Sequence, residues 1–409
     1  MLDRKIVHMT LTDLYMGVIC IFPIATILMN EGVINKILFA VLIGLQVGML
    51  FDRRIRKRSF IVLFMMILNY VYALYNTKFP LHNTNLLLYF PFYLIYTYFM
   101  CDNSKAVLNW FKTNKQFLTT ILLVWNILVG ISVFFPSSYY IKEGGSAYFG
   151  SFCGTIFRLG PAAVFAQALA IMMQMFHGSR KAFLGNLLPV YSYFMGSSRT
   201  YLGVGLCLLM VSWYIFCEKK KTFWHSLIPF GIAVVIALSM SSMGDKIAFT
   251  LDEEQYGDFW FRVTSSRSVL WEIDLTAWSQ LPLLSQLLGG GMNFCYEASG
   301  RWGHNDFVEL ICSMGIAGII QYLVSIGMLL STGGQAKKTP VIINVCLFFA
   351  WLVNAFFNMH YVYFCAMLCY PFLVMGVREY FSTIAPTASA QDTELQATVN
   401  PVFHVRRNP

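Results

Sequence analysis

The stretch "SYFMGSSRTYLGVGL", Ser192 to Leu206, places one arginine inside a run from Ala182 to Cys217 that is otherwise uncharged. A lone arginine at the centre of a lipid-exposed helix costs at least about 2.5 kcal/mol. The run has 36 residues, enough for two membrane crossings at about 1.5 Å per residue, and "GSSR" is its one turn-like interruption. The sequence therefore predicts two helices here, with Arg199 at a membrane face where the second helix begins.

The composition of the whole chain also indicates a membrane protein. Of its 409 residues, 57% are hydrophobic and 12% are charged, whereas soluble domains carry about 25% charged residues. No N-terminal segment has the cleavage site of a signal peptide, so Tyr15 to Met29 is predicted to be a first span. We therefore expect an all-α, polytopic integral membrane protein.

Runs of about 17 to 25 apolar residues can cross a bilayer as helices. We predict about twelve transmembrane helices, near residues 13–30, 36–51, 59–76, 84–101, 117–135, 157–176, 182–196, 199–217, 222–240, 305–330, 340–357 and 359–377. They make up a transmembrane bundle over residues 1–381. Residues 382–409 lack periodicity and are predicted to form a disordered cytoplasmic tail.

The basic residues indicate an orientation for this bundle. With both chain ends inside, the inner segments hold 20 of the 29 Lys and Arg, including "DRRIRKRS" (Asp52 to Ser59) and "EKKK" (Glu218 to Lys221). Such an excess on one side follows the positive-inside rule. The net charge of +9 is then explained by topology and by contact with anionic membrane lipids, and nucleic-acid binding is not expected.

One predicted outer loop, residues 241–303, is long enough to fold outside the membrane, and such loops often carry function. Within it, "TSSRSVLWEIDLTAWSQLPLLSQLLGGG" predicts an amphipathic helix that Ser265 or Ser266 caps and that the three glycines at 289–291 end. By itself, its apolar stripe indicates a helix that covers the bundle. Its predicted interfacial residues are Trp271 and Trp278.

Arg267 opens this helix as Arg199 opens a span, each after two serines ("SSRS" and "SSRT"). A cation at a helix N-terminus meets the positive end of the helix dipole. An anion bound between the guanidinium and the backbone N–H groups would reverse that cost, since both groups bind phosphate. Alternatively, each arginine reaches lipid headgroups or a nearby acid such as Asp274. Two such arginines on one face favour a diphosphate site.

A third candidate lies in "GRWGHNDFVELICSMGIAGIIQYLV", Gly300 to Val324. Asp306 and Glu309 have the spacing of a capping box, so a helix is predicted to begin there. His304 then lies just outside the helix N-terminus, where the dipole keeps the imidazole neutral and able to act as a general base. A capping or interfacial histidine is the alternative. Close helix packing is expected at Gly315 and Gly318.

The cysteines and acids indicate no further chemistry. Only Cys153 and Cys295 lie clearly in outer segments, and no spacing pairs them in a disulfide. No CxxC, HExxH or acidic metal-binding cluster occurs, so neither a metal nor another cofactor is expected.

Three quoted segments together resemble a known family. "SSRTYLGVGL", "SRSVLWEIDL" and "GHNDFVELICSMGIAGI" are similar to segments of the O-antigen ligase and O-antigen or capsular polysaccharide polymerase superfamily. The similarity covers Tyr148 to Gln321, about two fifths of the chain. "FRLGPAAVFA" resembles a further family segment, although Ala162 stands where asparagine is common, so Arg158 is a weaker correspondence.

The resemblance implies a metal-independent, inverting glycosyltransferase of the membrane-embedded C type. Its donor would be an oligosaccharide on undecaprenyl diphosphate, at the outer face of the bacterial cytoplasmic membrane. Arg199 and Arg267 would bind the diphosphate and act in catalysis, and His304 would be the base. Arg158 and Asn305 are further substrate-binding candidates. A chain-length regulator is a partner that such a polymerase can take.

Three alternatives stay open beside a polymerase of repeat units. An O-antigen ligase shares these motifs and transfers the glycan to lipid A core, but the outer loop shows no extra basic cluster for a phosphorylated core. A lipid-linked oligosaccharide flippase or other transporter would place polar groups near the midplane of both halves, whereas here they gather in the second half. A peptidoglycan polymerase would need an acidic outer-loop residue that we cannot place.

Overall fold

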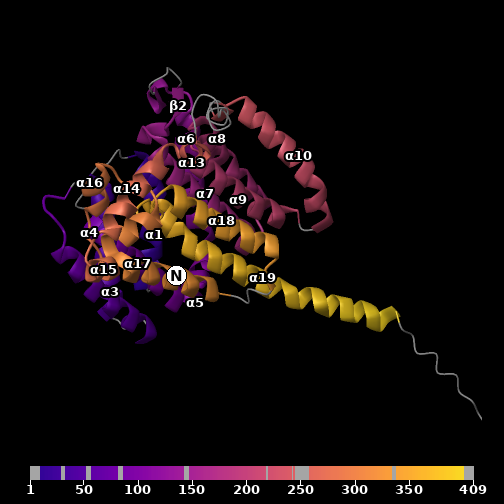
Figure 1. Ribbon diagram of the computed structural model, residues 1–409. Helices are drawn as coiled ribbons and strands as arrows, with labels where there is room; N and C mark the ends of the chain where they lie inside the picture. Colours follow the sequence, from indigo (N-terminus) through magenta and orange to yellow (C-terminus); the bar gives the residue numbers. More distant parts are fainter. Residues whose placement is uncertain are drawn as a thin grey trace, which may run out of the picture.

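The chain folds almost entirely into α-helices (Figure 1). The computed structural model describes residues 10–28, 33–51, 57–81, 86–141, 147–217, 220–241, 243–244, 258–333 and 338–399. Within these ranges the one sheet is a hairpin in which β1 (Tyr139–Ile141) pairs antiparallel with β2 (Ala147–Phe149). The predicted all-α fold class is therefore confirmed.

Seven of the described helices are long and apolar enough to cross a membrane. They are α1 (Leu11–Leu28), α6 (Lys115–Ser132), α7 (Ile156–His177), α9 (Arg199–Phe216), α10 (Lys220–Ser239), α17 (Asp306–Ser331) and the first part of α19 (Phe364–Val399). This set agrees with a membrane-spanning protein.

The remaining elements complete the described chain. The helices are α2 (Val33–Phe51), α3 (Lys57–Tyr75), α4 (Leu86–Asp102), α5 (Ser104–Thr113), α8 (Leu187–Met195), α13 (Phe259–Thr264), α14 (Arg267–Ser279), α15 (Leu283–Leu288), α16 (Phe294–Ser299) and α18 (Val341–Phe357). The 3₁₀-helices are η1 (Pro136–Ser138), η2 (Ser151–Cys153) and η3 (Arg180–Asn186).

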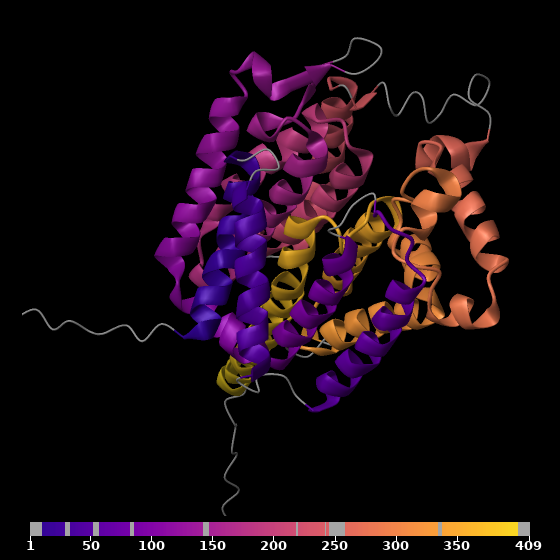
Figure 2. The same cartoon turned by 90° about the vertical axis from the view of Figure 1, so that its left-hand side faces the viewer.

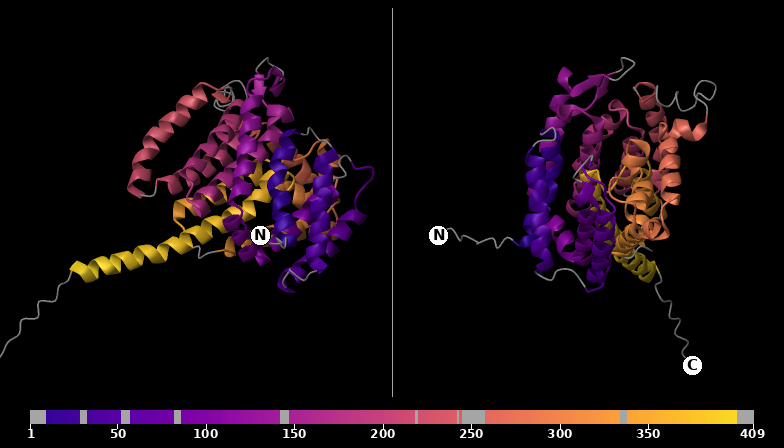
Figure 3. Two further views of the ribbon diagram at one scale, coloured as in Figure 1. Left: turned by 180° about the vertical axis from the view of Figure 1, so that it is seen from behind. Right: turned by 60° about the vertical axis from the view of Figure 1, so that its left-hand side comes forward.

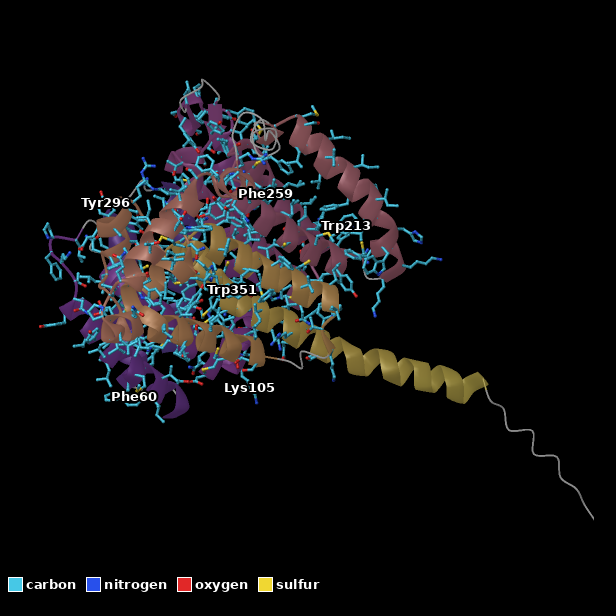
Figure 4. The ribbon with its side chains drawn as sticks, in the orientation of Figure 1. Phe60, Lys105, Trp213, Phe259, Tyr296 and Trp351 are labelled. Atoms are coloured by element: carbon cyan, nitrogen blue, oxygen red, sulfur yellow. The ribbon has the colours of Figure 1, made fainter. Side chains whose placement is uncertain are left out.

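Several helices turn apolar side chains outward, as contact with lipid requires. α10 stands at the edge of the bundle in Figures 1 and 3, and its Ile228 is 73% exposed. Phe60 of α3 lies at the opposite rim in Figure 4 and is 61% exposed. Large apolar surfaces of this kind are rare on soluble monomers. A surrounding bilayer explains why these apolar side chains point outward.

α7 is a central helix of the bundle and contacts α1, α8, α9 and α19. Gly160 explains how α9 approaches it so closely, because a Cβ at Gly160 would lie 2.2 Å from the ring of Tyr201. Tyr201 of α9 therefore packs directly on the backbone of α7. This contact fixes the start of α9, and with it Arg199, beside the start of α7.

The predicted span 182–196 is not one α-helix. Its place is taken by η3 and the nine-residue α8, which run back along α7. A Cβ at Gly185 would meet Ala170, whereas one at Gly196 would meet Ile156 near the other end of α7. A 3₁₀-helix rises about 2.0 Å per residue, against about 1.5 Å in an α-helix. The tighter winding lets this short segment extend along most of α7.

α17 is broken in its middle, which the sequence does not predict. Gly315 has φ 68° and ψ −171°, and a Cβ there would lie 2.5 Å from the backbone of Leu287. The break folds the two halves together, so Tyr322 donates a hydrogen bond to the carboxyl group of Asp306, sixteen residues earlier. The predicted close packing at Gly315 is present, but with α15 and with a change of helix direction.

The predicted amphipathic helix in the outer segment is divided into α14 and α15. Pro282 lies between the two helices. It explains the division, because proline has no N–H to donate and disfavours helical geometry in the preceding residue. Gly289 to Gly291 do not merely end a helix, since the amides of Gly290 and Gly291 donate to carbonyls of α17. In Figure 2, α14–α16 lie on the opposite side of the molecule from α1 and α6.

The chain beyond Ser382 differs from its prediction over the described part. α19 continues to Val399 and projects away from the bundle in Figure 1. The segment "ASAQDTELQA" is rich in Ala, Gln, Glu and Leu, which favour helix. Residues 400–409 of the predicted tail lie outside the described residues, as does "LDEEQYG" of the outer loop.

Candidate functional site

The two arginines each begin a helix, as the sequence predicts. α9 starts at Arg199, where the Ser198 hydroxyl caps the helix by accepting from the N–H of Tyr201. α14 starts at Arg267 after two serines with φ 55° and 64°, so the turn from α13 is tight.

Both guanidinium groups reach the C-terminal ends of other helices. Arg199 donates to the carbonyl of Arg262 in the last turn of α13, at 3.1 Å, and to the hydroxyl of Ser265. Arg267 donates to the carbonyl of Phe357, the last residue of α18. A cation at a helix C-terminus is favoured by the dipole. Arg199 thus stabilises the C-terminal end of α13, and Arg267 stabilises the C-terminal end of α18.

Arg199 and Arg267 meet at one cavity of about 360 Å³. This is within the range of about 300 to 1,000 Å³ for small-molecule pockets. Its lining also includes hydroxyls of the two serine–arginine turns, and no described lining residue is an Asp or Glu. Apolar side chains of α18 line one side. The cavity therefore combines two cations, several donors and an apolar wall. The other polar lining residues are Ser197, Ser198, Thr200, Thr264, Ser265 and Asn358.

Asp274, the acid considered as a partner for Arg267, does not line this cavity. A Cβ at Gly303 would lie 3.3 Å from its Oδ2, and Glu309 lies close enough to interact with it electrostatically. Burial raises the pKa of Asp274 to about 6.

The Arg267 guanidinium is itself largely buried, and burial lowers its pKa, while the nearby phenols of Tyr363 and Tyr201 act to raise it.

His304 is half-buried beside Arg267, immediately before α17. Burial, and then the positive charge of Arg267, lower its pKa to about 4. The imidazole is therefore neutral at neutral pH. Its Nδ1 is buried and has no hydrogen-bond partner among the described residues. His304 is not among the residues that line the arginine cavity.

The start of α17 is one residue earlier than the predicted capping box. Asn305 is the N-cap, and its Oδ1 accepts from the N–H groups of Phe307 and Val308 at 2.9 and 3.2 Å. The Glu309 carboxylate instead accepts from the N–H of Gly303. Asn305 therefore has a structural task at the position predicted to bind substrate.

Arg158 lies in the first turn of α7, where it acts electrostatically on the thiol of Cys153. It does not line the arginine cavity, although its neighbours Ile156 and Phe157 do. Cys153 and Cys295 are both free, and Cys295 packs instead with Cys312. The structure therefore does not join the two outer cysteines.

The sequence does not predict the part that the turn between α18 and α19 takes in the site. Asn358 lines the cavity, and Tyr363 packs against Tyr201 with ring centroids 6.3 Å apart. His360 is buried with its Nδ1 2.9 Å from the amide nitrogen of Asn354, and burial lowers its pKa to about 3. His360 and Tyr363 fall within residues 359–377, which the sequence predicts to be an apolar span, and Asn358 falls between that span and the one before it.

Within the described ranges, no three His, Cys, Asp or Glu side chains are grouped as ligands for a metal ion. No protein-family model matches the chain, and no curated protein sequence matches it.

Proposed function

We propose that the protein is a membrane-embedded glycosyltransferase that polymerises oligosaccharide repeat units carried on undecaprenyl diphosphate. The observation that supports this most is the convergence of Arg199 and Arg267 on a cavity whose described lining contains no carboxylate. Guanidinium groups bind phosphate oxygens bidentately. Charge that develops on a diphosphate leaving group is stabilised by such preorganised cations.

His304 is the proposed base of this reaction. The acceptor hydroxyl attacks the anomeric carbon, the bond from that carbon to the diphosphate oxygen breaks with its electron pair, and the imidazole takes the hydroxyl proton. This single displacement inverts the anomeric configuration. Burial lowers the pKa of His304 most, and the positive charge of Arg267 lowers it further. A diphosphate bound at Arg267 would offset this second effect. Donor binding therefore brings the base closer to the pH at which it works best.

The proposed topology has about twelve crossings, the C-type glycosyltransferase architecture and a cavity that faces outward from the bacterial cytoplasmic membrane. The positions of the basic residues support it, since Arg180 and Lys220 begin elements that lie at the opposite helix ends from Arg199. A cysteine replacing exposed Glu272 should react with an impermeant thiol reagent in intact cells, and one replacing Lys220 only after permeabilisation. The reverse pattern would invert the topology.

A ligase that transfers the glycan to lipid A core would use the same arginines and histidine, and differs in its acceptor. A flippase or other transporter finds some support in the broken α17, because discontinuous helices are common in transporters. The carbonyls at this break are occupied, however: Cys312 and Ser313 accept from Gly290 and Gly291, and Met314 accepts from Asn69. A transported ion would find these groups already bonded.

We propose that no divalent metal takes part, since two arginines supply the positive charge that a cation would. The expected partners are the lipid-linked donor, the acceptor glycan, membrane lipids and, in the cell, a chain-length regulator.

The test uses purified protein in detergent with the lipid-linked repeat unit as sole substrate and excess EDTA. A polymerase should yield a ladder of longer lipid-linked glycans. A product that forms only when lipid A core is added would make the protein a ligase. Complete loss of the ladder on adding EDTA would overturn the metal-free mechanism. Movement of the substrate across vesicles without any new glycosidic bond would make the protein a transporter.

A further inference from the structure

Gly303, the residue before His304, is held from both sides. Its N–H donates to Oε1 of Glu309 at 2.6 Å, and its carbonyl accepts from the indole N–H of Trp271. Trp271 belongs to α14, and Glu309 belongs to the first half of α17. The peptide groups on either side of Gly303 are therefore fixed by two separate elements.

These two bonds bear directly on the conformation of His304. Its φ is 50°, in the left-handed region, which costs a residue with a side chain about 1 to 2 kcal/mol. The carbonyl held by Trp271 belongs to the peptide group whose rotation about N–Cα defines that φ. On the other side, Asn305 is fixed by capping α17. The orientation of the imidazole is thus set by the hydrogen bonds that fix Gly303 before it and Asn305 after it.

The space around Gly303 admits no other residue without adjustment. A Cβ there would lie 3.3 Å from Oδ2 of Asp274, 3.5 Å from Val308 and 3.6 Å from Oε1 of Glu309. The segment before His304 is therefore enclosed on its side-chain side as well as bonded along its backbone. This enclosure makes the position of His304 depend on α14 and α17 together.

We infer that Trp271 and Glu309 are positioning residues that hold the His304 imidazole in place for the reaction by fixing the backbone of Gly303. The inference rests on the proposed function, in which His304 is the base. Neither residue touches the substrate in this account. Their loss should therefore lower kcat and leave the KM for the donor nearly unchanged, because the arginine cavity is not altered.

Trp271 and Trp278 provide a matched pair for the test. Both lie on α14 and pack against the cluster of Cys295, Val308 and Cys312. The Nε1 of Trp278 is buried without a hydrogen-bond partner among the described residues. Trp271→Phe removes the bond to Gly303, whereas Trp278→Phe removes a comparable indole and no such bond. A misplaced catalytic group costs about 10- to 100-fold in rate. We expect that loss in kcat for Trp271→Phe and less than about twofold for Trp278→Phe.

Glu309 is tested by rescue. Glu309→Gln keeps an oxygen that can accept from Gly303 and should retain most of kcat, whereas Glu309→Ala should lose about as much as Trp271→Phe. Amide hydrogen exchange of the peptide containing Gly303 and His304 gives a readout that does not depend on the reaction. Exchange should accelerate in Trp271→Phe and Glu309→Ala, and not in Trp278→Phe.

The two hypotheses fail in different ways. Wild-type enzyme that forms no glycan would refute the proposed function. Active wild-type enzyme in which Trp271→Phe and Trp278→Phe have equal kcat would refute the positioning role alone. Equal losses in Glu309→Gln and Glu309→Ala would also refute it.

Discussion

α7 and α17 are both long, apolar helices, yet only α17 is broken. α7 is buried along nearly all of its length. Neighbouring helices approach α7 closely at its small residues, as α9 does where Tyr201 packs on Gly160. α17 changes direction at Gly315 and carries two buried carboxyl groups, Asp306 and Glu309, in its first turns.

The two helices have different roles: α7 supports the elements around the site, and α17 leads out of the site. The unbroken α7 places the start of α9, and so Arg199, and its Ile156 and Phe157 line the arginine cavity. The folded start of α17 packs against α14 and α15. It thereby places His304 beside the helix that begins at Arg267. A straight α17 would carry its first turns away from these contacts.

The largest expected effects are at the three residues that this arrangement brings to one end of the bundle. Arg199→Ala, Arg267→Ala and His304→Ala should each lower polymer formation by at least about 10²-fold at normal protein levels. Lysine at either arginine should rescue poorly, since it lacks the bidentate fork. Arg301→Ala is the control, because Arg301 is exposed in the same outer segment. Near-normal polymer from purified His304→Ala enzyme would remove the base from the mechanism.

The features predicted from the sequence are those that depend on local pattern. Hydropathy indicated α7 and α17 equally well, and the serine–arginine turns indicated where α9 and α14 begin. The break at Gly315 depends on the distant residues Leu287 to Gly291, so no local period reveals it. The same holds for the carbonyls that the arginines cap, since Phe357 is ninety residues from Arg267.

A stability measurement sharpens the comparison further. Gly315→Ala places a side chain at positive φ and against the backbone of Leu287, so it should destabilise the fold by about 1 to 3 kcal/mol or more. Gly327→Ala, in the second half of the same helix, meets nothing within 4 Å and should be neutral or stabilising by about 0.5 to 1 kcal/mol. Thermal unfolding in detergent compares the two. Equal midpoints would mean that the break does not require glycine.

The smallest effect is expected in the pH dependence. kcat/KM reports the free enzyme, in which the pKa of His304 is about 4. Because the base acts in its neutral form, the rate should fall twofold near pH 4 and be constant from about pH 5 to neutrality. His177→Gln, at the far end of α7 from Arg158, should keep the same profile. A limb centred near pH 6.5 would show that the imidazole is neither buried nor close to a cation.

The most direct test of the account measures binding at the arginine cavity. A soluble short-chain polyprenyl diphosphate is titrated into purified wild-type protein and into Arg199→Ala, Arg267→Ala, His304→Ala and Arg301→Ala, with calorimetry as the readout. Each of the first two variants should weaken binding by about tenfold or more, which is about 1.4 kcal/mol. His304→Ala and Arg301→Ala should bind within about twofold of the wild type, because neither removes a guanidinium from the cavity. Wild-type affinity in Arg199→Ala and Arg267→Ala would contradict the claim that these two arginines form a diphosphate site.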